Sequence, residues 1–115
     1  MTSLEKAKLI AKVLDDKKAF KIEVIGVSKI SDITDYFVVA TGNANTHVHS
    51  LSDEVEFQLS EKGEKPLHTE GYASGTWVLL DYSDVVVHIF TQETREFYDL
   101  SRLWADGEKI ELTFD

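Results

Sequence analysis

The chain contains no cysteine, a single proline and no long apolar run. The absence of cysteine excludes disulfides, thiolate metal sites and cysteine nucleophiles, and it is typical of proteins from a reducing compartment. Residues 1–11 are amphipathic and contain lysine, so they resemble neither a signal peptide nor a membrane span. We therefore expect a cytoplasmic protein that makes no contact with a membrane.

Basic residues are also scarce relative to acidic ones, 12 against 21, and the formal net charge is −9. Such a chain meets like-charge repulsion at a nucleic-acid backbone, so we expect no direct nucleic-acid readout. A charged partner should instead be basic, for example a basic protein within a nucleoprotein.

The 115 residues predict one domain that spans residues 1–115. Apolar periodicity predicts helices over residues 2–18, 46–62 and 95–105, with a capping box at Thr2–Glu5 and a stop at Gly63. Alternating or continuous apolar runs predict strands over 20–27, 36–41 and 67–70 and a hairpin over 75–90. The chain is therefore predicted to be an α+β (mixed α/β) protein with a five-stranded mixed sheet flanked by helices. The tail around Ile110, Leu112 and Phe114 is either an edge strand or an arm that packs on a second subunit.

The hairpin is the stretch around which the rest is organised. With Tyr82 and Ser83 as a two-residue loop, Asp81 pairs with Asp84 and Trp77 lies opposite His88. One face is then aliphatic and faces the core, since side chains alternate along a strand. The other face is mixed and carries Trp77, Leu79, Asp81, Asp84, Val86, His88 and Phe90.

A catalytic set or a metal site is not favoured by the spacing of the polar residues. His88 and Asp84 are close enough along the hairpin for acid–base chemistry, but the sequence pattern positions no nucleophile beside them. Asp81 and Asp84 are explained more simply as turn residues than as cation ligands. The glycines form no phosphate-binding loop, so we expect no cofactor.

The mixed face also has the composition of a protein-binding hot spot, in which aromatic and aliphatic anchors lie beside a few charges. The alternative is that a helix covers this face and that Trp77 belongs to the core. The residues alone favour neither, whereas for Tyr98 and Trp104 the core is the expected place.

Several strings in the chain resemble one known family. They are Asp35–Gly42, Glu70–Gly71, the run from Trp77 to Phe90 with its WxLxDYxDxxVHxF pattern, and Arg95, Tyr98, Leu100 and Leu103–Trp104. Together they resemble the Iojap / ribosomal silencing factor (RsfS) family, in the family's order and over nearly the whole chain beyond the first helix.

The resemblance implies a fold similar to the nucleotidyltransferases, without their Gly-Ser and paired-aspartate signature, and a protein that is not an enzyme. It implies binding to large-subunit ribosomal protein fourteen, a steric block to joining with the small subunit, lower translation, and a homodimer when free. The partner-binding residues predicted on this basis are Glu70, Trp77, Leu79, Asp81, Tyr82, Asp84, His88 and Phe90.

Two alternatives stay open at this point. One is a metal-dependent, nucleotidyltransferase-like enzyme that uses Asp81, Asp84 and His88. The other is a plain dimerisation module that meets its own copy through the apolar hairpin face or through the tail.

Overall fold

The computed structural model describes residues 1–99 and 105–114. The elements follow the predicted order and are listed here with their bounds: α1 Ser3–Asp16, β1 Phe20–Gly26, β2 Tyr36–Gly42, α2 Asn45–Glu61, β3 His68–Glu70, β4 Trp77–Asp81, β5 Val85–Thr91, α3 Gln92–Tyr98 and β6 Glu108–Ile110. The capping box of α1 is confirmed, since the Thr2 hydroxyl accepts from the Glu5 amide and the Glu5 carboxylate accepts from the Thr2 amide. Of the described helices, none is long and apolar enough to cross a membrane.

The strands form one mixed sheet in the order β3-β4-β5-β2-β1-β6. β2 and β5 run parallel, and the other neighbouring pairs run antiparallel. The expected count of five strands is wrong, because residues 108–110 add a sixth strand on the free edge of β1. The prediction of a central, doubly covered strand at residues 36–41 is confirmed, since β2 lies inside the sheet and is mostly buried.

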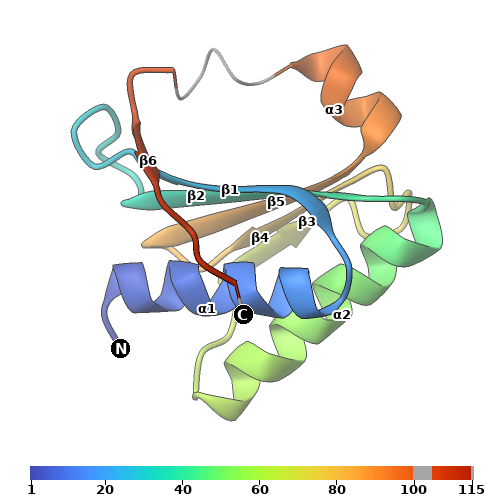
Figure 1. Ribbon diagram of the computed structural model, residues 1–115. Helices are drawn as coiled ribbons and strands as arrows, with labels where there is room; N and C mark the ends of the chain where they lie inside the picture. Colours follow the sequence, from blue (N-terminus) through green and yellow to red (C-terminus); the bar gives the residue numbers. More distant parts are fainter. Residues whose placement is uncertain (100–104, 115) are drawn as a thin grey trace.

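Helices α1 and α2 cover one face of the sheet, and α3 lies on the opposite face (Figure 1). The main core fills the space between the sheet and α1 and α2, and it contains the aliphatic hairpin face of Val78, Leu80, Val85, Val87 and Ile89. A smaller cluster of Ile25, Val27, Val39 and Phe90 lies on the α3 side, with Phe37 and Trp77 packed against it. The predicted division of the hairpin into an aliphatic core face and a mixed face is therefore confirmed.

The hairpin register differs from the predicted one by two residues. Asp81 lies opposite Val86 and Trp77 opposite Phe90, because the Tyr82 amide donates to the Val85 carbonyl and extends the ladder. The turn then falls at Ser83, which adopts a left-handed φ of 76° and donates its amide to the Asp81 carboxylate. A shift of two residues leaves every strand side chain on its predicted face.

The third helix is shorter than expected at its C-terminal end. It begins at Gln92 behind a Thr91 cap, and it ends at Tyr98 because Asp99 adopts a left-handed conformation. The prediction of a helix over residues 95–105 is therefore wrong at Asp99, and residues 100–104 lie outside the described part of the chain.

Candidate functional site

The α3 side of the sheet carries a surface that we call the outer face, made by Glu70, Trp77, Leu79 and Asp81 with His68. Along β4, Val78 and Leu80 point into the core, whereas Trp77, Leu79 and Asp81 are only partly buried. Glu70 pairs with Leu79, and His68 pairs with Asp81, so their side chains share one face of the sheet. The two edge residues are well exposed, at 65% for the Glu70 side chain and 58% for His68.

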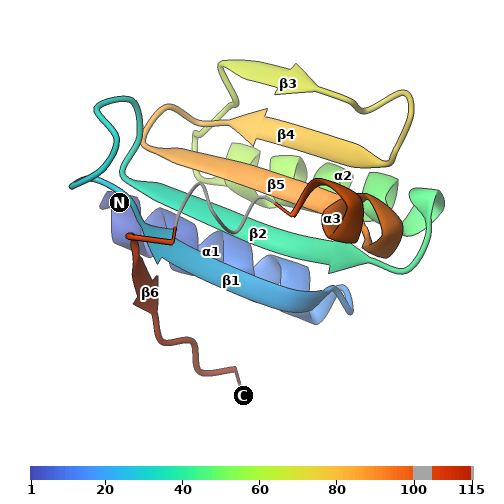
Figure 2. The same ribbon diagram turned by 90° about the horizontal axis from the view of Figure 1, so that it is seen from above.

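On the outer-face side, no described helix lies over β3 and the far part of β4. Helix α3 lies over β5 and β2, whereas β3 and β4 extend beyond it (Figure 2). The segment between β3 and β4 is held close by Gly71, whose φ is +80° and where a Cβ atom would lie 1.9 Å from the Trp77 carbonyl oxygen. Only glycine fits there, and this close approach keeps Glu70 beside the start of β4.

Trp77 is the aromatic centre of the outer face. Its ring lies 5.0 Å from Phe90 and 5.3 Å from Tyr98 of α3, centroid to centroid, and its indole N–H donates to His88 Nδ1 at 3.2 Å. The ring is therefore fixed in orientation while part of it stays open to solvent. A rigid, partly exposed tryptophan costs little conformational entropy when it binds a partner.

His88 lies beneath Trp77 and is only 7% exposed. Burial lowers its pKa from 6.5 to about 4, so the imidazole is neutral near pH 7. The bond from Trp77 makes Nδ1 the acceptor and places the ring hydrogen on Nε2. His88 therefore orients Trp77 and is too buried to contact a partner, in contrast to its predicted role. Phe90 was also predicted to contact the partner, but it is only 1% exposed and is likewise inaccessible.

Tyr82 was expected in an exposed turn, but it is 4% exposed and belongs to the core on the α1 and α2 side. The reason is the shifted register, which makes Tyr82 a continuation of β4 on the same side as Leu80. The structure therefore does not support the predicted contact of Tyr82 with a partner.

Asp84 was expected on the mixed face, but its carboxylate points to α1. Lys6 Nζ donates to Asp84 Oδ1 at 2.7 Å, and the Ser3 hydroxyl donates to Oδ2 at 3.0 Å. Lys6, itself 6% exposed, also pairs with Glu64. Asp84 thus neutralises a buried lysine and joins the hairpin turn to the first helix.

The enzyme alternative needed Asp81, Asp84 and His88 to converge. Asp81 lies on the outer face, Asp84 on the side of α1 and His88 beneath Trp77, so the three do not form one site. Within residues 1–99 and 105–114, no group of three or more histidine and carboxylate side chains is placed to hold a metal ion.

The sequence missed several residues that the fold brings to this surface. Tyr98, expected in the core, is 53% exposed and contacts Trp77, and neighbouring Phe97 is 81% exposed. Arg95 donates to the Thr41 hydroxyl at 2.8 Å, to the Lys21 carbonyl at 2.6 Å and to Glu23 at 2.5 Å, which anchors α3 to β1 and β2. Both aromatics lie in the last turn of α3, and no residue pattern indicated that the helix ends there. Trp104 lies outside the described residues.

The fold and this surface define an α+β protein whose accessible chemistry, aromatic and acidic side chains on an open sheet face, is typical of protein-binding surfaces. The family model described as "Ribosomal silencing factor during starvation" matches residues 1–115. The chain belongs to this family of ribosomal silencing factors, which bears out the resemblance found in its motifs.

Individual relatives agree with this assignment. The ribosomal silencing factor RsfS of Halalkalibacterium halodurans is 36% identical over 97% of this chain and 96% of its own length. A crystal structure of a protein from Chromobacterium violaceum superimposes with a TM-score of 0.89 and is 36% identical, covering 100% of this chain and 95% of that one. The chloroplastic protein Iojap of Zea mays is 32% identical over 92% of this chain and 46% of its own length.

Proposed function

We propose that the outer face docks this ribosomal silencing factor on a basic protein of the large ribosomal subunit, namely large-subunit protein fourteen. The observation that carries the proposal is the open side of β3 and β4, where Trp77 and Leu79 lie partly exposed between the acids Glu70 and Asp81. Buried aromatic and aliphatic anchors surrounded by charges supply most of the binding energy in protein interfaces.

The charge of the chain supports a basic partner. A net charge of −9 disfavours direct contact with ribosomal RNA, but it speeds encounter with a cationic protein surface. Glu70 and Asp81 flank the apolar anchors and would pair with lysine or arginine side chains of that partner. Tyr98, beside Trp77, extends the same surface.

The consequence of docking is steric. A domain seated on the large-subunit protein at the surface that meets the small subunit occupies the place of the small subunit, prevents joining and lowers translation. No bond is made or broken in this mechanism, so we propose a binding protein and not an enzyme.

Co-sedimentation of the purified protein with large subunits tests the docking surface. Trp77→Ala and Leu79→Ala should each weaken binding by about 2 kcal/mol or more, which is about thirtyfold in Kd. Asp81→Asn should weaken it by about tenfold and reduce its salt dependence, while it keeps an acceptor for the Ser83 amide. Matched controls are Ile33→Ala, a residue that is 84% exposed, and Glu61→Gln, which is exposed at the end of α2.

Subunit joining, followed by light scattering, provides the second readout. The wild-type protein should inhibit joining, and Trp77→Ala should fail to do so at matched concentration. If the folded Trp77 and Leu79 variants bind large subunits as tightly as the two controls do, the outer face is not the docking surface.

We further propose that the free protein forms a homodimer that shares part of this surface. Leu67, 76% exposed just before β3, and Phe97 would leave water on association. Sedimentation velocity should then show a dimer that dissociates when large-subunit protein fourteen is added, and a protein that stays monomeric at high concentration would contradict this proposal.

A further inference from the structure

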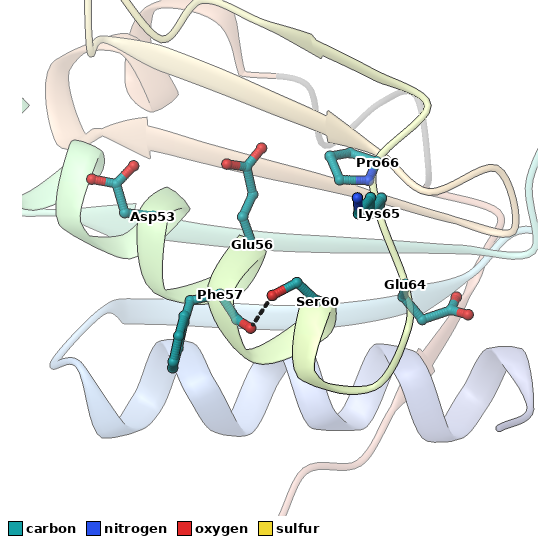
Figure 3. Close-up of a pocket in the computed structure, with 7 residues that line it drawn as sticks. All are labelled: Asp53, Glu56, Phe57, Ser60, Glu64, Lys65 and Pro66. Carbon is teal, nitrogen blue, oxygen red and sulfur yellow. Dashed lines mark hydrogen bonds between the residues drawn. The ribbon is translucent and has the colours of Figure 1, made fainter.

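One side of α2 holds the connection between β3 and β4. Asn45, His49 and Asp53 are spaced four residues apart along the helix, so their side chains share one side of it, which we call the α2 stripe. Figure 3 shows Asp53 on the opposite side of α2 from Phe57. The connection lies beside the N-terminal end of α2 (Figures 1 and 2), and we call its residues 71–75 the glycine loop.

Each residue of the α2 stripe takes part in a hydrogen bond to the glycine loop. Asn45 Nδ2 donates to the Ser74 carbonyl at 2.7 Å. His49 Nε2 lies 2.5 Å from the Tyr72 carbonyl oxygen and donates to it, since a carbonyl can only accept. The Tyr72 hydroxyl donates to Asp53 Oδ2 at 3.1 Å, and the Tyr72 ring lies 4.6 Å from His49, centroid to centroid. These contacts tie the glycine loop to the helix.

Glycines at both ends let the loop approach its two neighbours closely. Gly75 has a φ of +67°, and a Cβ atom there would lie 2.8 Å from His49 Nε2 and displace the ring. Gly71, at the other end, lies against the Trp77 carbonyl oxygen. The Gly75 amide donates to the Gly71 carbonyl at 3.1 Å, which closes the loop. The glycine loop therefore connects the α2 stripe to the end of β3 and the start of β4.

Glu70 depends on this connection more than the aromatic centre of the outer face does. Strand β3 has three residues, lies at the edge of the sheet and is exposed along its length, so it has few contacts of its own. Trp77, by contrast, is fixed by its ring contacts and by its bond to His88. Glu70 directly precedes Gly71, and its neighbour His68, with Nε2 at 3.4 Å, lies on the same short strand. Movement of the glycine loop would therefore move the Glu70 carboxylate.

We propose that Asn45, His49 and Asp53 are positioning residues, which hold the Glu70 carboxylate where a lysine or arginine of the docked partner meets it. This inference rests on the docking function proposed for the outer face, and it adds α2 to the elements that set the affinity. The α2 stripe itself does not meet the partner, because α2 covers the other face of the sheet. An anchored carboxylate loses less conformational freedom on pairing than a mobile one, so anchoring strengthens binding.

The test measures the affinity of the full-length protein for large ribosomal subunits, together with its free energy of unfolding in urea. Tyr72→Phe removes the bond to Asp53 without a change of charge, and His49→Ala removes the bond to the loop carbonyl. Each should weaken binding by about threefold. His49→Gln keeps an N–H donor near the position of Nε2, so it should restore most of the affinity that His49→Ala loses.

His47→Ala is the matched control for a purely structural effect. His47 lies two residues from His49, but it bonds elsewhere: Nδ1 accepts from the Asn43 amide, and Nε2 donates to the Lys17 carbonyl. Its removal should lower the free energy of unfolding while the affinity for large subunits stays unchanged.

A double-mutant cycle shows whether the α2 stripe acts through Glu70. Glu70→Gln alone should weaken binding by about tenfold. Adding Tyr72→Phe to Glu70→Gln should weaken it by less than about 1.5-fold more, because no charge is left to position. Effects of the two substitutions that simply multiply would overturn the inference.

Three further results would overturn it. They are wild-type affinity in Glu70→Gln or in both Tyr72→Phe and His49→Ala, a loss of affinity in His47→Ala as large as in His49→Ala, and a His49→Gln protein that binds as weakly as His49→Ala. A failure of the outer face itself is distinguishable from these, because it appears as wild-type binding by the Trp77 and Leu79 variants.

Discussion

The stability of this protein should fall gradually below neutral pH, because His88 stays neutral in the fold but takes up a proton in the unfolded chain. The imidazole has a pKa of about 4 in the fold and 6.5 in an unfolded chain, because burial disfavours its charged form. Above pH 6.5 both states are neutral and the contribution of His88 to stability is complete. As the pH falls from 6.5 towards 4, the unfolded state binds a proton that the folded state refuses, so stability is lost.

The size of this effect follows from the shift. One pKa unit corresponds to about 1.4 kcal/mol, so the full shift amounts to about 3 kcal/mol. Between pH 7 and pH 5, where most carboxylates stay charged, we expect the free energy of unfolding to fall by about 2 kcal/mol. With an m-value near 2 kcal/mol/M, the urea midpoint should move down by about 1 M.

The assay is urea unfolding, followed by tryptophan fluorescence at pH 7, 6 and 5. His88→Asn keeps an acceptor for the Trp77 indole N–H but cannot take up a proton in this range, so it should lose this part of the pH dependence. His68→Asn, an exposed histidine on β3, serves as the matched control and should keep the wild-type dependence. A His88→Asn protein with the same loss of stability from pH 7 to 5 as the wild type would refute the reasoning.

Two further substitutions test contacts that hold the site in place. Asp84→Ala should destabilise the fold by about 3 kcal/mol in urea unfolding at pH 7, because it removes the bonds to Lys6 and Ser3 and leaves Lys6 with Glu64 alone. Burial alone would raise the pKa of Asp84, but Lys6 and Ser3 lower it below 3.8, so this difference should persist above pH 3.8 and shrink as the pH falls further. An Asp84→Ala protein as stable as the wild type would contradict that structural role. Arg95→Met should lower the free energy of unfolding by about 3 kcal/mol and speed amide hydrogen exchange in α3, because three hydrogen bonds that anchor the helix are lost. Unchanged exchange would show that other contacts hold α3 in place.

The helices and strands were predictable because their signals are local. The capping box at Thr2, the apolar periodicity of α1 and α2 and the β-branched runs of β2 and β5 are properties of neighbouring residues. The hairpin turn was not predictable in the same way, because Tyr82–Ser83 and Ser83–Asp84 both suit a two-residue turn. The structure has the turn at Ser83–Asp84, where Asp84 contacts Lys6, which lies 78 residues earlier in the chain.

The sixth strand and the end of α3 also depended on distant partners. Residues 108–110 are too short to form a strand alone and do so because β1 has a free edge. Asp99 ends α3 in a left-handed conformation that aspartate tolerates, but its residue type does not require it.

The amino-acid sequence by itself determined the family, the acidic character and the division of the hairpin into an aliphatic and a mixed face, since motif spacing, charge and alternation are written along the chain. Only the tertiary structure decided which of the predicted partner-binding residues a partner can reach. Glu70, Trp77, Leu79 and Asp81 stay accessible, whereas Tyr82, Asp84, His88 and Phe90 are taken up by the core, α1 and Trp77. The physical reason is that accessibility depends on what packs above a side chain, and that neighbour comes from elsewhere in the sequence.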